Sequence, residues 1–251
     1  SASGDSTAAA LFVVSHQTAQ TGMINLAEFV RICHAKDIPV IVDAAAECDL
    51  EAFLEQGADL VIYSAHKFLA GLTAGIIAGR KDLVRACFLQ QLGISRAMKV
   101  GRESVASTTA ALIRWSKLDH EEINRQIRAR SEAALAELQG IDGLEAWIES
   151  DPTGNPVPRV RLKIDAHKLG IQAEQFRRLL AHCSPAIHLR AHDSDQSSLL
   201  VDPVAASDEE MREVVSRISR FLAKPGELTR YCDLPLPPSE YLDNWPDPPP
   251  Q

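Results

Sequence analysis

Roughly the first hundred residues alternate between short, continuous apolar runs and segments in which apolar residues recur at helical spacing. The β-branched apolar runs predict buried strands at residues 9–16, 38–47, 59–65 and 74–80. The amphipathic segments predict helices at residues 25–37, 49–58 and 81–93, with Asn25 as the N-cap of the first. Alternation of this kind is typical of βαβ units, so we expect an α/β fold with a mainly parallel sheet.

The second half of the chain has a different pattern. Residues 103–139 form one long helical segment, of a kind that can link two domains. Strands are expected at residues 143–151, 158–165, 186–193 and 197–204, and helices at residues 172–183 and 207–223. Ser207 and Glu210 form a predicted capping box at the start of the last helix. We therefore expect an α+β domain here, followed by a proline-rich segment, residues 234–251, that is extended or disordered.

Composition narrows the class of protein. The 251 residues suffice for one large domain or two small ones, and the net charge of −8 argues against a nucleic-acid partner. No apolar run approaches the ~18 residues of a membrane span. The cysteines are scattered without a CxxC pair, so we expect neither a disulfide framework nor a metal site, and a reduced, cytoplasmic location. They are Cys33, Cys48, Cys87, Cys183 and Cys232.

The strand pattern begins almost at the first residue, with ALFVV at residues 10–14. A fold that opens in the middle of its pattern indicates a fragment or a shortened homologue, and this is what we expect of the chain.

Polar side chains follow three of the predicted parallel strands. They are the run Ser15-His16-Gln17, then Asp43, then Ser64 with His66 and Lys67. Ligands of open α/β sheets bind beyond the carboxyl ends of the strands, so we expect these groups to converge on one crevice.

An acid and a lysine at the ends of neighbouring parallel strands suit pyridoxal phosphate. Lys67 can form a Schiff base with the cofactor aldehyde, and Asp43 can pair with the protonated pyridine nitrogen and keep the ring an electron sink. Each residue alone has an ordinary alternative, since a strand-terminal Asp is commonly a cap or turn former and a lone Lys a surface charge. Their pairing at matching strand ends favours the cofactor interpretation.

The same dipeptide occurs again as His167-Lys168, in KIDAHKLGI. That copy follows a polar segment in the second half of the chain and has no matching acid at a strand end. We interpret it as a surface pair, so it serves as an internal contrast to His66-Lys67.

Three segments together resemble a known family: VIVDAAAECDL, ADLVIYSAHKFLAGLTAGIIAGRKDLV and GISRAMKVGRES. They are similar to fold-type I, aspartate aminotransferase-like pyridoxal phosphate enzymes, and within these to the selenocysteine synthase-like group. That group includes L-seryl-tRNA selenium transferases and D-glucosaminate-6-phosphate ammonia-lyases. The resemblance is strong from roughly Leu11 to Arg114 and weaker beyond.

The resemblance implies roles by position. Lys67 would carry the Schiff base and Asp43 would be the pyridinium partner. Ser64 and His66 would lie near the cofactor phosphate or ring, and His16 and Gln17 over its face or at the substrate. Arg96 and Lys99 would meet an anionic substrate or phosphate; their alternative is a solvated loop.

The resemblance also implies an organisation. Residues 1–105 would be part of the large cofactor-binding domain, residues 106–225 the linking helix and the C-terminal small domain, and residues 226–251 the proline-rich tail. Relatives carry a phosphate-binding turn and a ring-stacking side chain in an N-terminal part that this sequence does not show. They often have Gly-Pro after the lysine, where this chain has Gly71-Leu72.

Three functions follow as hypotheses. The first is a lyase that eliminates ammonia from an amino acid or amino-sugar acid, a small-molecule amino substrate, and works as a homodimer or a higher homo-oligomer. The second is a selenium transferase acting on seryl-tRNA, which the net charge of −8 disfavours. The third is a truncated, non-catalytic homologue that serves as a dimer partner.

Overall fold

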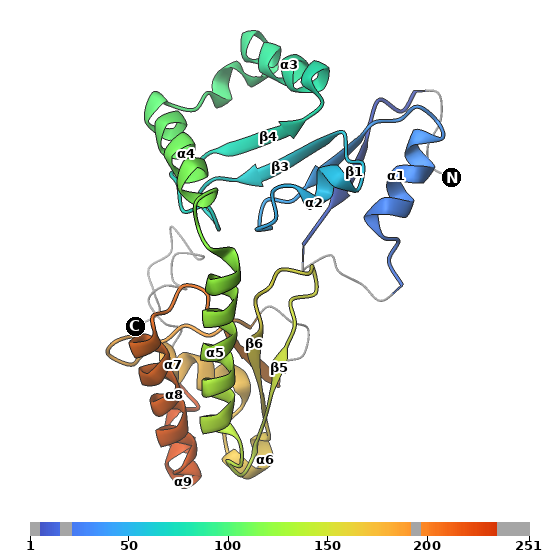
Figure 1. Ribbon diagram of the computed structural model, residues 1–251. Helices are drawn as coiled ribbons and strands as arrows, with labels where there is room; N and C mark the ends of the chain where they lie inside the picture. The colour runs from blue at the N-terminus through green and yellow to red at the C-terminus, as the bar shows by residue number, and fades with distance from the viewer. Residues whose placement is uncertain (1–5, 16–21, 192–196, 235–251) are drawn as a thin grey trace. The chain divides into compact units, whose positions relative to one another are not determined.

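A computed structural model describes residues 6–15, 22–191 and 197–234 (Figure 1). The chain divides into two compact units. Unit 1 consists of Ser1–Asp119 and Pro152–Asn155, and unit 2 of His120–Asp151 and Pro156–Gln251. The units thus divide after Asp119, whereas the sequence prediction ends the first domain at residue 105.

Unit 1 contains a sheet in the order β1-β2-β3-β4. The first three strands run parallel and β4 pairs antiparallel with β3, so the prediction of a mainly parallel α/β arrangement is confirmed. The strands are β1 (Ala10–Val13), β2 (Val40–Asp43), β3 (Leu60–Ser64) and β4 (Gly75–Gly79). The helices are α1 (Leu26–His34), α2 (Ala52–Glu55), α3 (Lys81–Leu89), η1 (Gln90–Leu92), η2 (Ile94–Met98) and α4 (Arg102–Trp115).

The local signals of α1 act as predicted. Asn25 caps the helix, because its Oδ1 accepts a hydrogen bond of 2.9 Å from the backbone N–H of Glu28. Leu26, Val30 and Cys33 are buried on one side of α1 and belong to a core that includes Val40, Val42, Val61 and Tyr63. One face of the sheet is therefore buried against α1.

The Asp59 side chain stabilises the edge of this sheet at which β2 and β3 begin. Its buried carboxylate accepts hydrogen bonds from Val40 N (2.7 Å) and Arg80 Nη1 (3.0 Å) and contacts His34 Nε2 (2.8 Å). Gly79, with φ of +140°, pairs with the next residue, Leu60, and a Cβ there would come within 2.2 Å of the Asp59 carbonyl oxygen. Asp59 therefore ties the start of β2, the end of α1 and the exit of β4 together.

We expect the stabilisation by Asp59 to be lost in acid. Burial alone would raise the pKa of Asp59, but the hydrogen bonds from Val40, His34 and Arg80 bring it below its ordinary value. A carboxyl with a lowered folded pKa stabilises the protein above its unfolded pKa of about 3.9, and this contribution disappears as the pH falls through the folded value. Asp59→Asn should lower the free energy of unfolding by about 1.5–3 kcal/mol at pH 7.

Denaturant unfolding of wild type and Asp59→Asn from pH 7 to pH 3 measures this difference, which should shrink steadily below about pH 4. Asp82→Asn is the matched control, because Asp82 also bonds Arg80 (2.8 Å) but its side chain is 62% exposed. A deficit that is independent of pH would contradict a role for the Asp59 charge.

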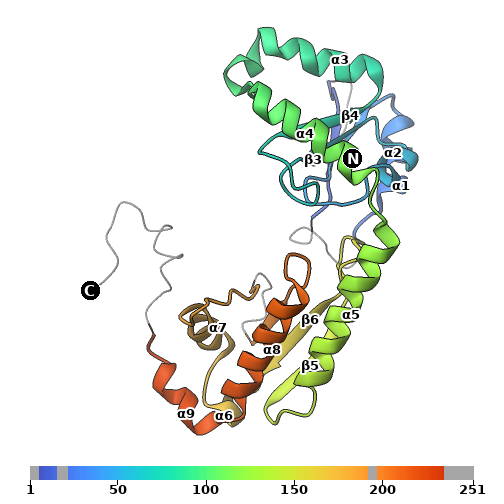
Figure 2. The same cartoon turned by 60° about the vertical axis from the view of Figure 1, so that its left-hand side comes forward.

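Unit 2 contains an antiparallel sheet in the order β5-β6-β7. Its strands are β5 (Leu144–Glu149), β6 (Arg159–Ile164) and β7 (Ser198–Val201). Its helices are α5 (His120–Leu138), α6 (Ala166–Leu169), α7 (Ala173–Ala181), α8 (Asp208–Leu222), α9 (Pro225–Leu228) and η3 (Thr229–Tyr231). Figure 2 shows α5 and α8 side by side against this sheet. The predicted capping box of α8 is present, with Ser207 and Glu210 bonded to each other's backbone.

The prediction of one continuous helix over residues 103–139 is wrong. The segment forms two helices, α4 and α5, separated at residues 116–119. The backbone N–H groups of Lys117 and Leu118 turn back to Arg114 O and Trp115 O, which ends α4. Asp119, a residue type that favours the N-cap position, directly precedes α5.

Two predictions near the end of the chain also need correction. The strand expected at residues 186–193 contributes a single bridge, Arg190 with Leu200, within its described part. The predicted tail, residues 226–251, begins inside folded structure, because Pro225 opens α9 and Leu228 is buried in the unit 2 core. Proline suits a first helical position, where its missing N–H is not needed. Residues 235–251 lie outside the described residues.

Among the described residues, no helix has both the length and the apolar character that crossing a membrane requires.

Candidate functional site

The parallel strands of unit 1 end together at one edge of the sheet (Figure 1). The register pairs Val13 with Asp43 and Asp43 with Ile62, and Ser64 follows Ile62 on β3. Because side chains alternate along a strand, Asp43, Ile62 and Ser64 share one face. The sheet thus brings the ends of β2 and β3 together as predicted from the sequence.

Asp43 is half-buried at the centre of this edge. Its Oδ1 accepts a hydrogen bond of 3.1 Å from Ala45 N, so the residue forms the turn that is the ordinary role of a strand-terminal Asp. Its Oδ2 has no hydrogen-bond partner in the described part of the chain. The carboxylate therefore orders its own loop with one oxygen, and among the described residues its other oxygen has no donor.

Lys67 lies in a loop after β3, residues 65–71, which we call the lysine loop. The side chains of His66 and Lys67 are exposed, whereas Ala65 and Leu69 are buried. Within the described residues the Lys67 side chain makes no hydrogen bond or ion pair. The loop therefore presents an accessible amine beyond the end of the strand.

Ser64 and His66 form a pair beside this lysine. A hydrogen bond of 2.9 Å joins Ser64 Oγ and His66 Nδ1. The bond orients the imidazole, and its Nε2 remains available as a donor or acceptor. Ser64 and His66 can therefore act together as a small polar surface next to the lysine.

Tyr63 is not part of this surface, although it directly precedes Ser64 in sequence. Its side chain points into the opposite, buried face, and its hydroxyl has no partner among the described residues. Burial raises the pKa of Tyr63 to about 12, and the charge of Asp49 adds to the effect. A phenol in this state stays neutral at physiological pH.

Of the other four predicted residues, the structure describes only Arg96 and Lys99. His16 and Gln17 lie outside the described residues. Arg96 lies in η2 and Lys99 directly follows it, and both are exposed. Neither side chain makes a hydrogen bond or ion pair with a described residue, so their role stays a prediction.

The second His-Lys pair lies at the surface, as predicted. Lys168 is in α6, its side chain is 55% exposed, and its Nζ donates a hydrogen bond of 2.7 Å to Asp142 Oδ1. This contact with Asp142 raises the pKa of Lys168. Lys168 is thus a paired surface ammonium, unlike Lys67.

Sequence reasoning missed the residues that hold the two loops of the site. Two residues of α4 form hydrogen bonds with the backbone just after Lys67: Ser107 with Leu72 N, and Arg114 with Leu69 O. The segment Pro152–Asn155 bonds the loop that follows Asp43: Asn155 Oδ1 accepts from Cys48 N (3.0 Å) and Thr153 Oγ1 donates to Glu47 (2.9 Å). These partners are distant in sequence, and no local pattern marks them.

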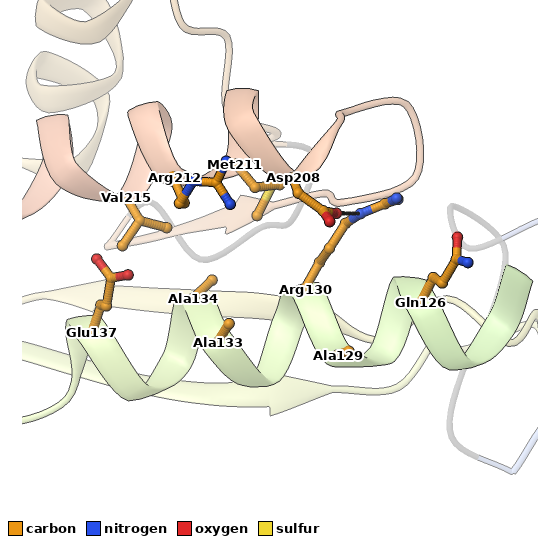
Figure 3. Close-up of a pocket in the computed structure, with 10 residues that line it drawn as sticks. All are labelled: Gln126, Ala129, Arg130, Ala133, Ala134, Glu137, Asp208, Met211, Arg212 and Val215. Carbon is orange, nitrogen blue, oxygen red and sulfur yellow. Dashed lines mark hydrogen bonds and ion pairs between the residues drawn. The ribbon is translucent and has the colours of Figure 1, made fainter.

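A separate groove lies in unit 2, between α5 and α8 (Figure 3). Its volume is about 320 Å³, and an ion pair of 2.6 Å between Arg130 and Asp208 lies at its side. Its lining residues all come from these two helices, so it is distinct from the edge that carries Asp43 and Lys67.

Residues 19–131 match the sequence family described as L-seryl-tRNA selenium transferase. The matched segment includes Asp43, Ser64, His66 and Lys67. The resemblance stated from the sequence motifs is confirmed by this match.

Two curated proteins are similar over most of the chain. D-glucosaminate-6-phosphate ammonia lyase of Salmonella typhimurium (strain 14028s / SGSC 2262) is 37% identical over 87% of this chain and 58% of its own length. The 5'-C-glycyluridine monooxygenase-decarboxylase of a Streptomyces species is 36% identical over 88% of this chain and 55% of its own length. The chain therefore spans less than two thirds of either relative.

The solved structure of a D-glucosaminate-6-phosphate ammonia-lyase matches with a TM-score of 0.69 and 35% identity, over 90% of this chain and 60% of that chain. This match confirms the expectation of a fold-type I architecture.

Proposed function

We propose that this chain is the lysine-bearing part of a pyridoxal phosphate-dependent lyase that releases ammonia from an amino acid or amino-sugar acid. One observation carries the proposal: Asp43 ends β2, with one carboxylate oxygen unpartnered among the described residues, and the accessible Lys67 follows the neighbouring parallel strand β3 at the same sheet edge. The similarity to D-glucosaminate-6-phosphate ammonia lyase over 87% of the chain supports the reaction class.

The residues present fit the cofactor. Lys67 offers an exposed primary amine for its aldehyde, and Asp43 Oδ2 offers an acceptor for its ring N–H. The Ser64–His66 pair offers polar atoms for its phosphate or ring. When bound, pyridoxal phosphate supplies an electron sink that stabilises negative charge at the substrate α-carbon.

The chain's own residues would then act as follows. With the cofactor bound, Lys67 would hold it through its amine until a substrate amine takes that place, and Lys67 Nζ would then be free to accept the α-proton. The Asp43 carboxylate would accept the hydrogen bond of the ring N–H. Arg96 and Lys99 would hold an anionic group of the substrate, and His16 and Gln17 would lie over the cofactor face or at the substrate. The proton taken by Lys67 would then be available to the departing β-group, and hydrolysis of the remaining C–N bond would give a keto acid and ammonia.

The alternative of a selenium transferase has specific support in the family match at residues 19–131. Such an enzyme must bind a tRNA, and its affinity would depend on neutralising many phosphates. The net charge of −8 favours a small substrate instead.

We also propose that the protein is a cytoplasmic homodimer. Large apolar side chains are exposed along the segment from α3 to the start of α4, and a group of exposed apolar side chains can mark a protein–protein contact. They are Phe88 (65%), Leu92 (81%), Ile94 (82%), Met98 (72%) and Val105 (54%). Burial of this segment against a second copy would remove it from water, and sedimentation velocity would then show twice the mass of one chain.

Ammonia release from D-glucosaminate 6-phosphate, measured with and without added pyridoxal phosphate, tests the proposed reaction. We expect release only with the cofactor. Cofactor binding at Lys67 without ammonia release would indicate that the enzyme acts on a different substrate. Absence of cofactor binding would favour the third hypothesis, a non-catalytic homologue.

A further inference from the structure

The lysine loop is closed at its base by backbone hydrogen bonds. Gly71 N donates to Ala65 O (2.7 Å), and Ala65 N donates to Ala74 O (2.9 Å). Inside the loop, Ala70 N donates to Lys67 O (2.9 Å). Ala70 therefore holds the carbonyl of Lys67. The position of Lys67 thus depends on residues 69–72, which we call the far limb of the loop.

That limb has an unfavourable backbone conformation. Ala70 has φ of +52°, which is in the left-handed region that a residue with a Cβ rarely adopts. Strain of this kind persists only where the surrounding structure holds it in place, and it is concentrated at functional sites. The question is what holds Ala70.

Helix α4 holds the limb on both sides of Ala70. Arg114 Nη2 donates a hydrogen bond of 2.9 Å to Leu69 O, and Ser107 Oγ accepts one of 3.0 Å from Leu72 N. Ser107 and Arg114 lie two turns apart on one side of α4, with Ala111 between them. The two bonds therefore flank the strained residue.

A glycine allows this approach. A Cβ at position 71 would lie 3.3 Å from Ala111 Cβ and 3.1 Å from Ala65 O, both tight contacts. The limb and α4 are thus close enough for the two hydrogen bonds because residue 71 has no side chain.

We propose that Ser107 and Arg114 are positioning residues for Lys67. They hold the far limb of the lysine loop in its strained conformation, and through the Ala70–Lys67 hydrogen bond they set where the Lys67 amine lies. The inference rests on the proposed function, because it assigns Lys67 the task of holding pyridoxal phosphate. Without the two bonds, Ala70 relaxes and the amine samples more positions.

Variants on α4 test this directly. Ser107→Ala removes the acceptor and Arg114→Met removes the donor, while Ser107→Thr and Arg114→Lys restore a hydroxyl and a cation. Thr109→Ala and Arg102→Met are matched controls on the same helix. Thr109 is exposed and its hydroxyl bonds Val105 O within α4 (2.9 Å), and Arg102 is exposed at the helix start.

Two readouts are measured on each variant. The first needs no cofactor: reductive methylation with formaldehyde, followed by peptide mass spectrometry, gives the labelling rate of Lys67 relative to Lys168. The second is the dissociation constant of pyridoxal phosphate from its visible absorption. We expect Ser107→Ala and Arg114→Met each to change the labelling ratio at least about threefold and to weaken cofactor binding about five- to tenfold. The controls should match wild type, and the conservative variants should recover most of the loss.

Each outcome decides one question. Wild-type values of both readouts in Ser107→Ala and Arg114→Met would overturn the positioning role. So would a lower melting temperature with an unchanged labelling ratio, because that is the result of a purely structural contact. A changed ratio in the variants, with no cofactor bound at Lys67 even in wild type, would support the positioning role and refute the proposed function.

Discussion

Lys67→Ala will abolish the visible absorption that pyridoxal phosphate gives with the chain and the borohydride-stable label at this position. Ammonia release should fall by at least about a thousandfold, because both the holding amine and the proton acceptor are lost. The fold should survive, since the Lys67 side chain is exposed and makes no hydrogen bond with the described residues. Absorption spectra, peptide mapping after reduction and a thermal melt measure the three effects.

Lys168→Ala is the matched control, because it removes the lysine of the same dipeptide at a surface position paired with Asp142. It should leave the absorption and the label unchanged. Label spread evenly over surface lysines in wild type, or absorption that persists in Lys67→Ala, would show that Lys67 does not hold the cofactor.

The sequence predicted those parts of the fold whose determinants are local. The strands of unit 1 follow from continuous apolar runs, and α1 follows from its apolar stripe and the cap at Asn25. The capping box of Ser207 and Glu210 was also readable, because both partners lie within one turn. Signals of this kind need no knowledge of the tertiary structure.

The break between α4 and α5 shows where local reasoning fails. Residues 103–139 keep a helical pattern through the break, and only the turn hydrogen bonds of Lys117 and Leu118 reveal it. The α4 contacts to the lysine loop are a second case, since Leu72 and Ser107 are far apart in sequence. A pattern read along the chain carries no information on such pairs.

Asp43 shows how two interpretations of one residue can both apply. From the sequence, Asp43 could either form a turn or pair with the cofactor. In the structure Oδ1 forms the turn with Ala45, and Oδ2 has no partner among the described residues. A carboxylate has two acceptor oxygens, so ordering its own loop does not prevent it from meeting a cationic ring.

Arg159 of unit 2 forms two ion pairs that no local sequence pattern predicts. Arg159 Nη1 donates to Asp151 Oδ2 (2.5 Å), and Arg159 Nε donates to Asp202 Oδ2 (2.8 Å). The side chains of Arg159 and Asp151 are only 10% and 1% exposed. We expect Arg159→Met to lower the free energy of unfolding by about 3–5 kcal/mol, because it removes the cation that neutralises the buried Asp151 carboxylate.

Arg125→Met is the control for this loss, since it makes the same substitution in the same unit at a side chain that is 75% exposed and paired with Glu122. It should leave the denaturation midpoint essentially unchanged. Adding Asp151→Asn to Arg159→Met should recover part of the loss by removing the carboxylate charge. A double variant no more stable than Arg159→Met would show that lost packing, rather than the carboxylate charge, explains the effect.

The deficit of Arg159→Met should also depend on pH. Burial would raise the pKa of Asp202, but Arg159 and Arg190 lower it below its ordinary value. The stabilisation from this shift is present above the unfolded pKa of about 3.9 and is lost as the pH falls through the folded value. The difference between wild type and Arg159→Met should therefore narrow below about pH 4, because acid protonates the carboxylates that the arginine neutralises.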